Sequence, residues 1–142
     1  MSVIQTLRSD VTPVAADAPL LDGARCLGQG ATALVPVIDG GQLVGMLSAR
    51  DIVVNAVVAE RDLDRLTVAD VMSRPHRCEP QTPIDEVAKH LATIDQPGLV
   101  VQDPGDASIL GVVEMAALLR PPAQQPHGPE PDYAKRVRGA GA

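Results

Sequence analysis

The sequence has almost no aromatic side chains: it contains no Phe, no Trp and a single Tyr among 142 residues. It therefore lacks the stacking platforms on which single-stranded nucleic acids usually bind. Positive charge is also scarce, because 12 Lys and Arg stand against 18 Asp and Glu, and the net charge of -6 repels a phosphate backbone. The composition argues against general nucleic-acid binding.

Long hydrophobic runs are missing as well, although 45% of the residues are hydrophobic and suffice for an ordinary core. The N-terminus, MSVIQTLRSD, lacks the apolar run of a signal peptide. No segment approaches the roughly 20 apolar residues that span a bilayer. We therefore expect a cytoplasmic protein with no membrane partner.

Cysteine is rare, and the sequence offers no constellation of catalytic or metal-binding residues. Cys26 and Cys78 are too few and too isolated for a disulfide framework, which favours reduced thiols. His76 and Cys78 would point to one side of an extended segment, but no further ligand lies at metal-site spacing. Because no nucleophile, base and orienting acid occur together either, the sequence predicts a non-enzyme without a metal.

The chain contains an internal repeat. Shifted by 64 positions, SDVTPVAADAPLLDGA overlies SRPHRCEPQTPIDEVA, so that Pro19 falls on Pro83. LVPVID, 34–39, then overlies GLVVQD, 98–103, and LVG overlies ILG after two extra residues in the second turn. Each half of the chain is therefore predicted to be one copy of the same supersecondary unit.

The sequence of each half predicts the element order β-α-β-β-α. A short extended segment leads to a helix with Pro19 or Pro83 at its first position, and Thr82 can cap the second of these helices. Two apolar strands follow, joined by DGGQ in the first half and DPGDAS in the second, both of which are hairpin turn chemistry. A closing helix ends each unit.

The closing helices, 51–59 and 115–119, are too apolar to lie on a free surface. DIVVNAVVA has a single uncharged polar residue after its first position, and MAALL has none. Such short helices need cover on more than one face. We expect the two halves to pack on each other and the pair to form a homodimer.

These features resemble a tandem pair of CBS domains, the Bateman module. The resemblance rests on VADVMSRP, on LVPVIDGGQLVGMLSARDI and on the glycine before each last strand segment. It implies an α+β fold of two β-α-β-β-α repeats related by pseudo-twofold symmetry. The first motif would span 3–59, a linker 60–66 and the second motif 67–119, followed by a flexible tail rich in Pro and Gly at 120–142.

The resemblance also implies a ligand site, because many members of the family bind adenosine-containing ligands between the two motifs. In the family's Gly-x-x-Ser/Thr-x-x-Asp pattern, here Gly45, Ser48 and Asp51, the Asp accepts from ribose hydroxyls and the Ser contacts phosphate. Arg50 could supply a phosphate fork. By the same analogy the adenine would lie against Thr12, Val14, Pro36 and Val37. The structural alternative is that Ser48 or Asp51 caps a helix, that Gly45 permits a close turn and that Arg50 is a solvated charge.

The second half departs from this pattern. Glu114 and Ala117 stand where the first half has Ser48 and Asp51, so we expect at most one nucleotide site per chain. The resemblance implies a stand-alone regulatory module without a tightly bound cofactor, which binds AMP, ADP, ATP or S-adenosylmethionine and signals to a protein partner. The alternative is a dimerising or protein-interaction scaffold of the same fold with an empty cleft.

Overall fold

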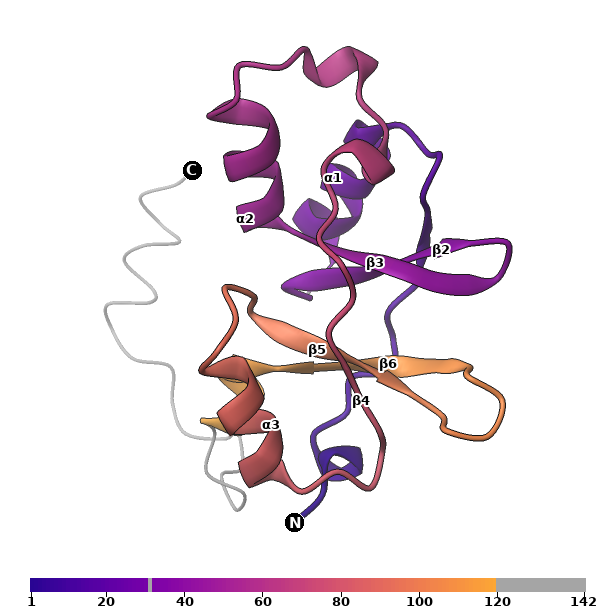
Figure 1. The fold of residues 1–142 in the computed structure, drawn as a ribbon, viewed down its shortest axis with the longest axis vertical. Coiled ribbons are helices and arrows are strands. Elements are labelled where there is room, and N and C mark those ends of the chain that lie inside the picture. The colour runs from indigo at the N-terminus through magenta and orange to yellow at the C-terminus, as the bar shows by residue number, and fades with distance from the viewer. Residues whose placement is uncertain (31, 120–142) are drawn as a thin grey trace, which may run out of the picture.

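Two three-stranded sheets face each other, with helices on their outer sides (Figure 1). This arrangement comes from a computed structural model that describes residues 1–30 and 32–119. The expected tail, 120–142, lies outside the described residues. In each sheet the first strand is parallel to the second, and the second is antiparallel to the third.

The two halves have the same order of elements, which confirms the predicted β-α-β-β-α repeat and the α+β class. The first half comprises β1 (Val14–Ala15), α1 (Leu20–Gln29), β2 (Leu34–Asp39), β3 (Gln42–Ser48) and α2 (Ala49–Ile52), which continues as the π-helix η2 (Val53–Val57). The second comprises β4 (Arg77–Cys78), α3 (Ile84–Leu91), β5 (Gly98–Gln102), β6 (Ile109–Glu114) and α4 (Met115–Leu118).

Turn and cap residues explain where these elements begin and end. Gly40 and Gly41 have φ angles of 58° and 80°, the left-handed conformations that a tight hairpin needs between β2 and β3. The expected position of the two prolines was wrong by one residue, because Pro19 and Pro83 are the N-cap residues that precede α1 and α3. Thr82 does not cap α3. Its hydroxyl instead accepts a hydrogen bond from the amide of Glu79, at 3.0 Å.

The halves exchange their opening segments. The 3-10 helix η1 (Val3–Gln5) lies on the second half, where the amide of Val3 donates to the carbonyl of Thr82. The 3-10 helix η4 (Val68–Asp70) lies on the first half, where the amide of Val68 donates to the carbonyl of Ala18. Val3 and Val68 are fully buried, so each half completes its core with a residue from the other half's sequence.

The inner faces of the sheets form a third core between the halves. Leu34 and Met46 of the first sheet pack with Val100 and Val112 of the second, and all four are fully buried. Met46 also exchanges backbone hydrogen bonds with Ser73, in the segment that connects the halves. The two halves are therefore held as one unit by apolar packing and by the connecting chain.

The first closing helix leaves apolar side chains uncovered on one chain. Val53, Val54, Val57 and Val58 are 43–69% exposed, whereas Ala56 is buried. The polar residue of this helix, Asn55, donates its amide to the carbonyl of Val71, which fixes the helix to the connecting segment. The residues 60–66 are exposed as expected, except for Leu66, which packs in the core of the first half.

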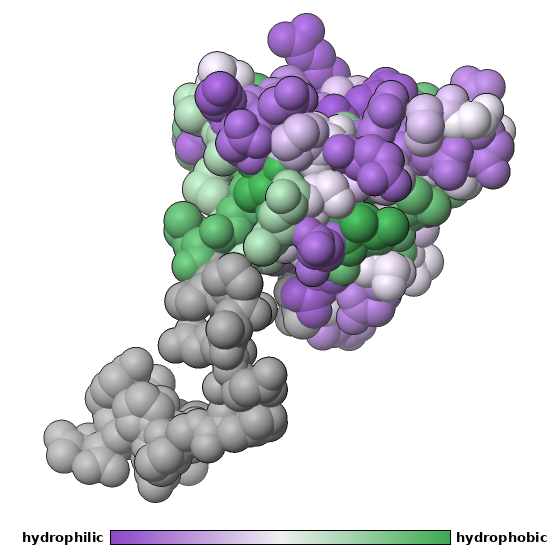
Figure 2. Space-filling view, turned by 90° about the horizontal axis from the view of Figure 1, so that it is seen from below, coloured by the Kyte–Doolittle hydropathy of each residue, from purple (hydrophilic) through white to green (hydrophobic). Residues whose placement is uncertain are grey.

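The surface is mostly hydrophilic, with apolar side chains gathered in patches on the face that Figure 2 shows. No helix among the described residues is long and apolar enough to cross a membrane.

Candidate functional site

The Ser48 and Asp51 side chains close the first turn of α2. The hydroxyl of Ser48 accepts from the amide of Asp51 at 3.3 Å, and the Oδ2 atom of Asp51 accepts from the amide of Ser48 at 2.9 Å. This reciprocal pair is a capping box, which satisfies two backbone donors that a helix start leaves free. The structural alternative for these two residues therefore holds, and it leaves their other oxygen atoms to be accounted for.

Asp51 also joins three parts of the chain. Its Oδ1 atom accepts from the hydroxyl of Ser73, in the connecting segment, and from the Nε2 atom of Gln96, at 3.0 Å, in the loop before β5. The same Nε2 lies 3.0 Å from the Ser73 hydroxyl. Asp51 is only 4% exposed, so its carboxylate is satisfied by the protein and shielded from water.

Sequence reasoning missed Ser73 and Gln96. Ser73 lies in the VMSRP segment that carries the family resemblance, and its distance of 22 residues from Asp51 gives no local signal. Gln96 comes from the other repeat, 45 residues from Asp51. Contacts of this kind depend on how the halves dock, which no periodicity in the sequence reports.

Gly45 is needed because the connecting segment passes directly over β3. A Cβ atom at this position would collide with the sulfur of Met72 and lie 2.9 Å from the carbonyl oxygen of Ser73. Gly111 has the same role on β6, where a Cβ would collide with the carbonyl of Arg8. The repeated glycine thus lets the chain cross each sheet, and in the first half it brings Ser73 to Asp51.

A cavity of about 510 Å³ opens beside this cluster, between the two halves. Ser48, Ala49 and Arg50 line it from the first turn of α2, and Asp95 and Gln96 line it from the loop before β5. The rest of its wall is formed by Leu27, Thr32, Ala33, Ile94, Pro97 and Met115. Its volume is within the range of ligand pockets in proteins, and its wall combines an apolar side with a few polar groups.

Arg50 lines this cavity, and its side chain makes one weak, exposed ion pair there. Its Nη2 atom is 3.8 Å from the Oδ2 atom of Asp95, and the two side chains are 58% and 87% exposed. An ion pair so exposed contributes little to stability. The guanidinium is therefore free to turn toward an anion in the cavity.

The four residues expected around an adenine lie outside this cavity. Thr12 is exposed, and Val14 and Val37 pack with α1 in the core of the first half. Pro36 is also buried on β2. It directly precedes Val37, so its side chain points to the opposite face of the sheet. None of the four lines the cavity beside Ser48 and Arg50.

The equivalent position in the second half is filled differently. A smaller cavity, of about 370 Å³, is lined by Arg8, Asp10, Glu114 and Ala117 among others. The Nη1 atom of Arg8 lies 3.8 Å from the Oε1 atom of Glu114, which also accepts from the amide of Ala33 at 3.4 Å. Glu114 thus has internal partners, and Ala117 offers no acceptor to a sugar.

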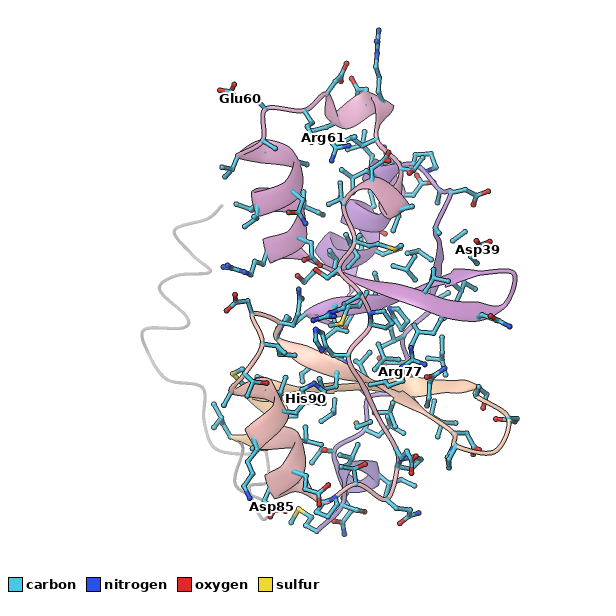
Figure 3. All side chains as sticks on the ribbon, viewed as in Figure 1. Asp39, Glu60, Arg61, Arg77, Asp85 and His90 are labelled. Carbon is cyan, nitrogen blue, oxygen red and sulfur yellow. The ribbon has the colours of Figure 1, made fainter. Side chains whose placement is uncertain are left out.

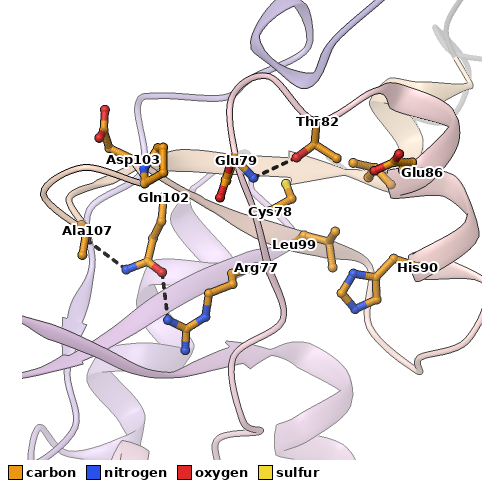
Figure 4. Close-up of a pocket in the computed structure, with 12 residues that line it drawn as sticks. Arg77, Cys78, Glu79, Thr82, Glu86, His90, Leu99, Gln102, Asp103 and Ala107 are labelled. Carbon is orange, nitrogen blue, oxygen red and sulfur yellow. Dashed lines mark hydrogen bonds between the residues drawn. The ribbon is translucent and has the colours of Figure 1, made fainter.

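A third cavity, of about 500 Å³, lies between β4, α3 and the turn after β5 (Figure 4). Several of its polar groups are hydrogen-bonded to one another. Arg77 donates to the side-chain oxygen of Gln102, and the amide nitrogen of Gln102 donates to the carbonyl of Ala107. Burial, together with the charge of Glu79, raises the pKa of the Cys78 thiol to about 11. This thiol is therefore a poor nucleophile or metal ligand at neutral pH.

His76 contacts His90, with 3.3 Å between the Nδ1 atom of His76 and the Nε2 atom of His90. His90 lies toward the end of α3 that is nearer to the first half, and Asp85 lies at the opposite end (Figure 3). Among residues 1–30 and 32–119, no group of three or more His, Cys, Asp and Glu side chains could hold a metal ion.

Comparison with known proteins agrees with this architecture. Residues 3–57 match the family model of the CBS domain. No curated protein shows a significant sequence match to the chain. A conserved CBS domain protein of unknown function from Thermoplasma acidophilum has a similar structure, with 22% identity and a TM-score of 0.76 over 83% of this chain and 67% of that one.

Two further similar structures contain ligands. CBSX2 in complex with AMP is 20% identical, with a TM-score of 0.70 over 84% of this chain and 94% of that chain. The CBS domain pair of protein MJ0100, in complex with 5'-methylthioadenosine and S-adenosyl-L-methionine, is 19% identical, with a TM-score of 0.72 over 100% of this chain and 98% of that chain. Residues 3–57 thus match the CBS domain family, and the described part of the chain has the fold of a CBS-domain pair.

Proposed function

We propose that the protein is a regulatory module that binds one adenosine-containing ligand per chain in the cavity beside Ser48, Arg50 and Gln96. The observation that carries this proposal is the juxtaposition, in one cavity between the halves, of an exposed guanidinium, a helix start and an apolar wall. Similar folds hold AMP, 5'-methylthioadenosine or S-adenosyl-L-methionine, which supports this ligand class.

The cavity suggests a distribution of the ligand's parts. Leu27, Ile94 and Met115 offer an apolar surface for an adenine ring. Arg50, at the first turn of α2, suits a phosphate because a guanidinium donates two parallel hydrogen bonds to such a group. This assignment replaces Thr12, Val14, Pro36 and Val37 as adenine contacts. It keeps Ser48, Arg50 and Asp51, with Gly45 as the residue that allows the connecting segment to approach.

The module would act through its partners and not through chemistry of its own. The exposed valines of α2 and η2 form an apolar surface suited to a second copy of the chain, and we propose a homodimer. Ligand bound between the halves would alter how they sit against each other, and a regulated protein would respond to that change. The competing function, a dimerising scaffold with an empty cleft, leaves the cavity and Arg50 without a role.

Calorimetric titration with AMP, ADP, ATP and S-adenosylmethionine tests the proposal. We expect one of them to bind, and we expect Arg50→Ala to weaken a phosphate-containing ligand about fivefold because a charge-assisted contact is lost. Binding of adenosine, which has neither a phosphate nor a carboxylate, should be unchanged by this substitution. Arg25→Ala is the matched control, since Arg25 is an exposed arginine of α1 that pairs with Asp22 and does not line the cavity. If none of the four ligands binds, the scaffold function is the better explanation.

A further inference from the structure

We propose that Gln96 is a displaceable internal ligand of Asp51, which a sugar hydroxyl must replace before a nucleotide can reach the carboxylate. This inference rests on the function proposed above and names the residue that controls access to the site. Gln96 and Asp51 are hydrogen-bonded neighbours, but Gln96 lines the cavity and Asp51 does not. The Gln96 amide therefore separates the acceptor from the space that a ligand would enter.

The side-chain amide of Gln96 makes the contacts that the two hydroxyls of a ribose could make. Its Nε2 atom donates toward the Oδ1 atom of Asp51 and lies at the same distance, 3.0 Å, from the Ser73 hydroxyl. The amide must have this orientation, because a flipped amide would place its oxygen against the carboxylate. Donation to a carboxylate oxygen is also what a ribose hydroxyl would provide. The two donors therefore compete for one acceptor.

The other end of the amide makes the internal contact imperfect. The Oε1 atom of Gln96 is buried and has no hydrogen-bond partner among the described residues. A buried acceptor without a donor is destabilising, because it has lost water and gained nothing in return. When Gln96 swings out, this oxygen regains solvent, and a ligand hydroxyl takes over the bond to Asp51. The closed arrangement is held by one end of the amide and opposed by the other.

Displacement would also connect ligand binding to the arrangement of the two halves. Asp51 belongs to the first half, Ser73 to the connecting segment and Gln96 to the second half. Removing Gln96 from the cluster releases one of the polar ties between the halves. The loop that carries Gln96 leads directly into β5, whose residues pack between the sheets. Occupancy of the site is thereby transmitted to the interface between the halves.

The test compares AMP affinity in the wild type, in Gln96→Ala and in Thr93→Ala. Thr93 is an exposed residue of the same loop whose hydroxyl donates to the carbonyl of His90, so this control reports any general loosening of the loop. We expect Gln96→Ala to bind AMP about 3- to 30-fold more tightly, as one charge-assisted hydrogen bond no longer competes. Thr93→Ala should bind like the wild type.

A second readout follows the amide itself. The side-chain amide resonances of Gln96, assigned by their loss in Gln96→Ala, should move toward the positions of solvent-exposed glutamines as AMP is added. If the wild type binds AMP and Gln96→Ala binds it equally or more weakly, the internal-ligand inference is overturned and the proposed function stands. If neither protein binds AMP, adenosine or S-adenosylmethionine, both are overturned. Binding by Gln96→Ala alone supports both.

Discussion

The hydroxyl of Ser73 donates a hydrogen bond to the Oδ1 atom of Asp51, and this bond ties the segment before β4 to the first turn of α2. The same carboxylate caps the helix through its other oxygen. One buried side chain therefore fixes a helix start, a connecting segment and, through Gln96, the opposite half. Substitutions here test stability and ligand binding together.

Replacing Asp51 by Ala should destabilise the protein and weaken nucleotide binding. The helix loses its capping box, and Ser73 and Gln96 lose their acceptor, so we expect the free energy of unfolding to fall by about 2–4 kcal/mol. Nucleotide affinity should fall by a further roughly 1.5–3 kcal/mol in the fraction that stays folded. Urea denaturation and calorimetry measure the two effects. Asp17→Ala is the control, because Asp17 is exposed, and an Asp51→Ala protein as stable as this control would contradict the role of the cluster.

The glycine of β3 should not tolerate even one methyl group. A Cβ at Gly45 meets the sulfur of Met72 and the carbonyl oxygen of Ser73, so Gly45→Ala should cost about 1–3 kcal/mol of stability, as overpacking does. Gly28 is the matched control. It lies in α1 with nothing within 4 Å of the added atom, and Gly28→Ala should stabilise the protein by about 0.5–1 kcal/mol. Thermal or urea unfolding of both variants checks the opposite signs.

His76 should make the protein less stable in mild acid. Burial, followed by the charges of His90 and Arg74, lowers the pKa of His76 below its ordinary value of 6.5. The unfolded chain therefore protonates His76 more readily than the folded chain does. The stability that neutral His76 contributes is complete above pH 6.5 and is lost as the pH falls below it. The urea midpoint should drop between about pH 7.5 and pH 5.5. His76→Gln should reduce that drop, and an identical pH dependence in the variant would rule out His76 as its source.

A charge on the apolar surface of η2 should prevent dimer formation. Val57 is 54% exposed in one chain, and Val57→Glu would place a carboxylate in the proposed interface. Light scattering should then report a monomer where the wild type reports a dimer at micromolar concentration. Gln42→Glu adds a charge at the hairpin between β2 and β3, away from α2 (Figure 1), and should leave the dimer intact. A wild type that is already monomeric at that concentration would overturn the proposal.

The wild type should bind no more than one nucleotide per chain. In the second half Glu114 is engaged by Arg8, and Ala117 lacks a group that accepts from ribose. Restoring the pattern with Glu114→Ser and Ala117→Asp should create a second, weaker binding event in a calorimetric titration. Saturation of the unmodified protein at two equivalent nucleotides per chain is the result that would disprove this asymmetry.

The repeated fold could be predicted from the amino-acid sequence alone. Strand and helix order follow from local patterns, such as the DGGQ turn with its two left-handed glycines and the apolar strands on either side. The internal repeat then predicts two similar units that pack on each other, and the burial of Leu34 against Val100 confirms this packing. Ser48 and Asp51 were also found from sequence, because their spacing is that of a helix cap and of the family motif at once.

The groups around Asp51 could not be predicted from the sequence, because they meet only in the folded chain. Ser73 and Gln96 reach it from distant parts of the chain, and the apolar wall of the cavity comes from Leu27, Ile94 and Met115 and not from the strand residues first expected. Likewise, Val3 packs in the core of the second half and Val68 in the core of the first half, which the order of the sequence does not predict. The physical reason is that local patterns report which face of an element is buried, whereas the choice of partner depends on how two apolar surfaces dock, and many residues far apart in sequence decide that together.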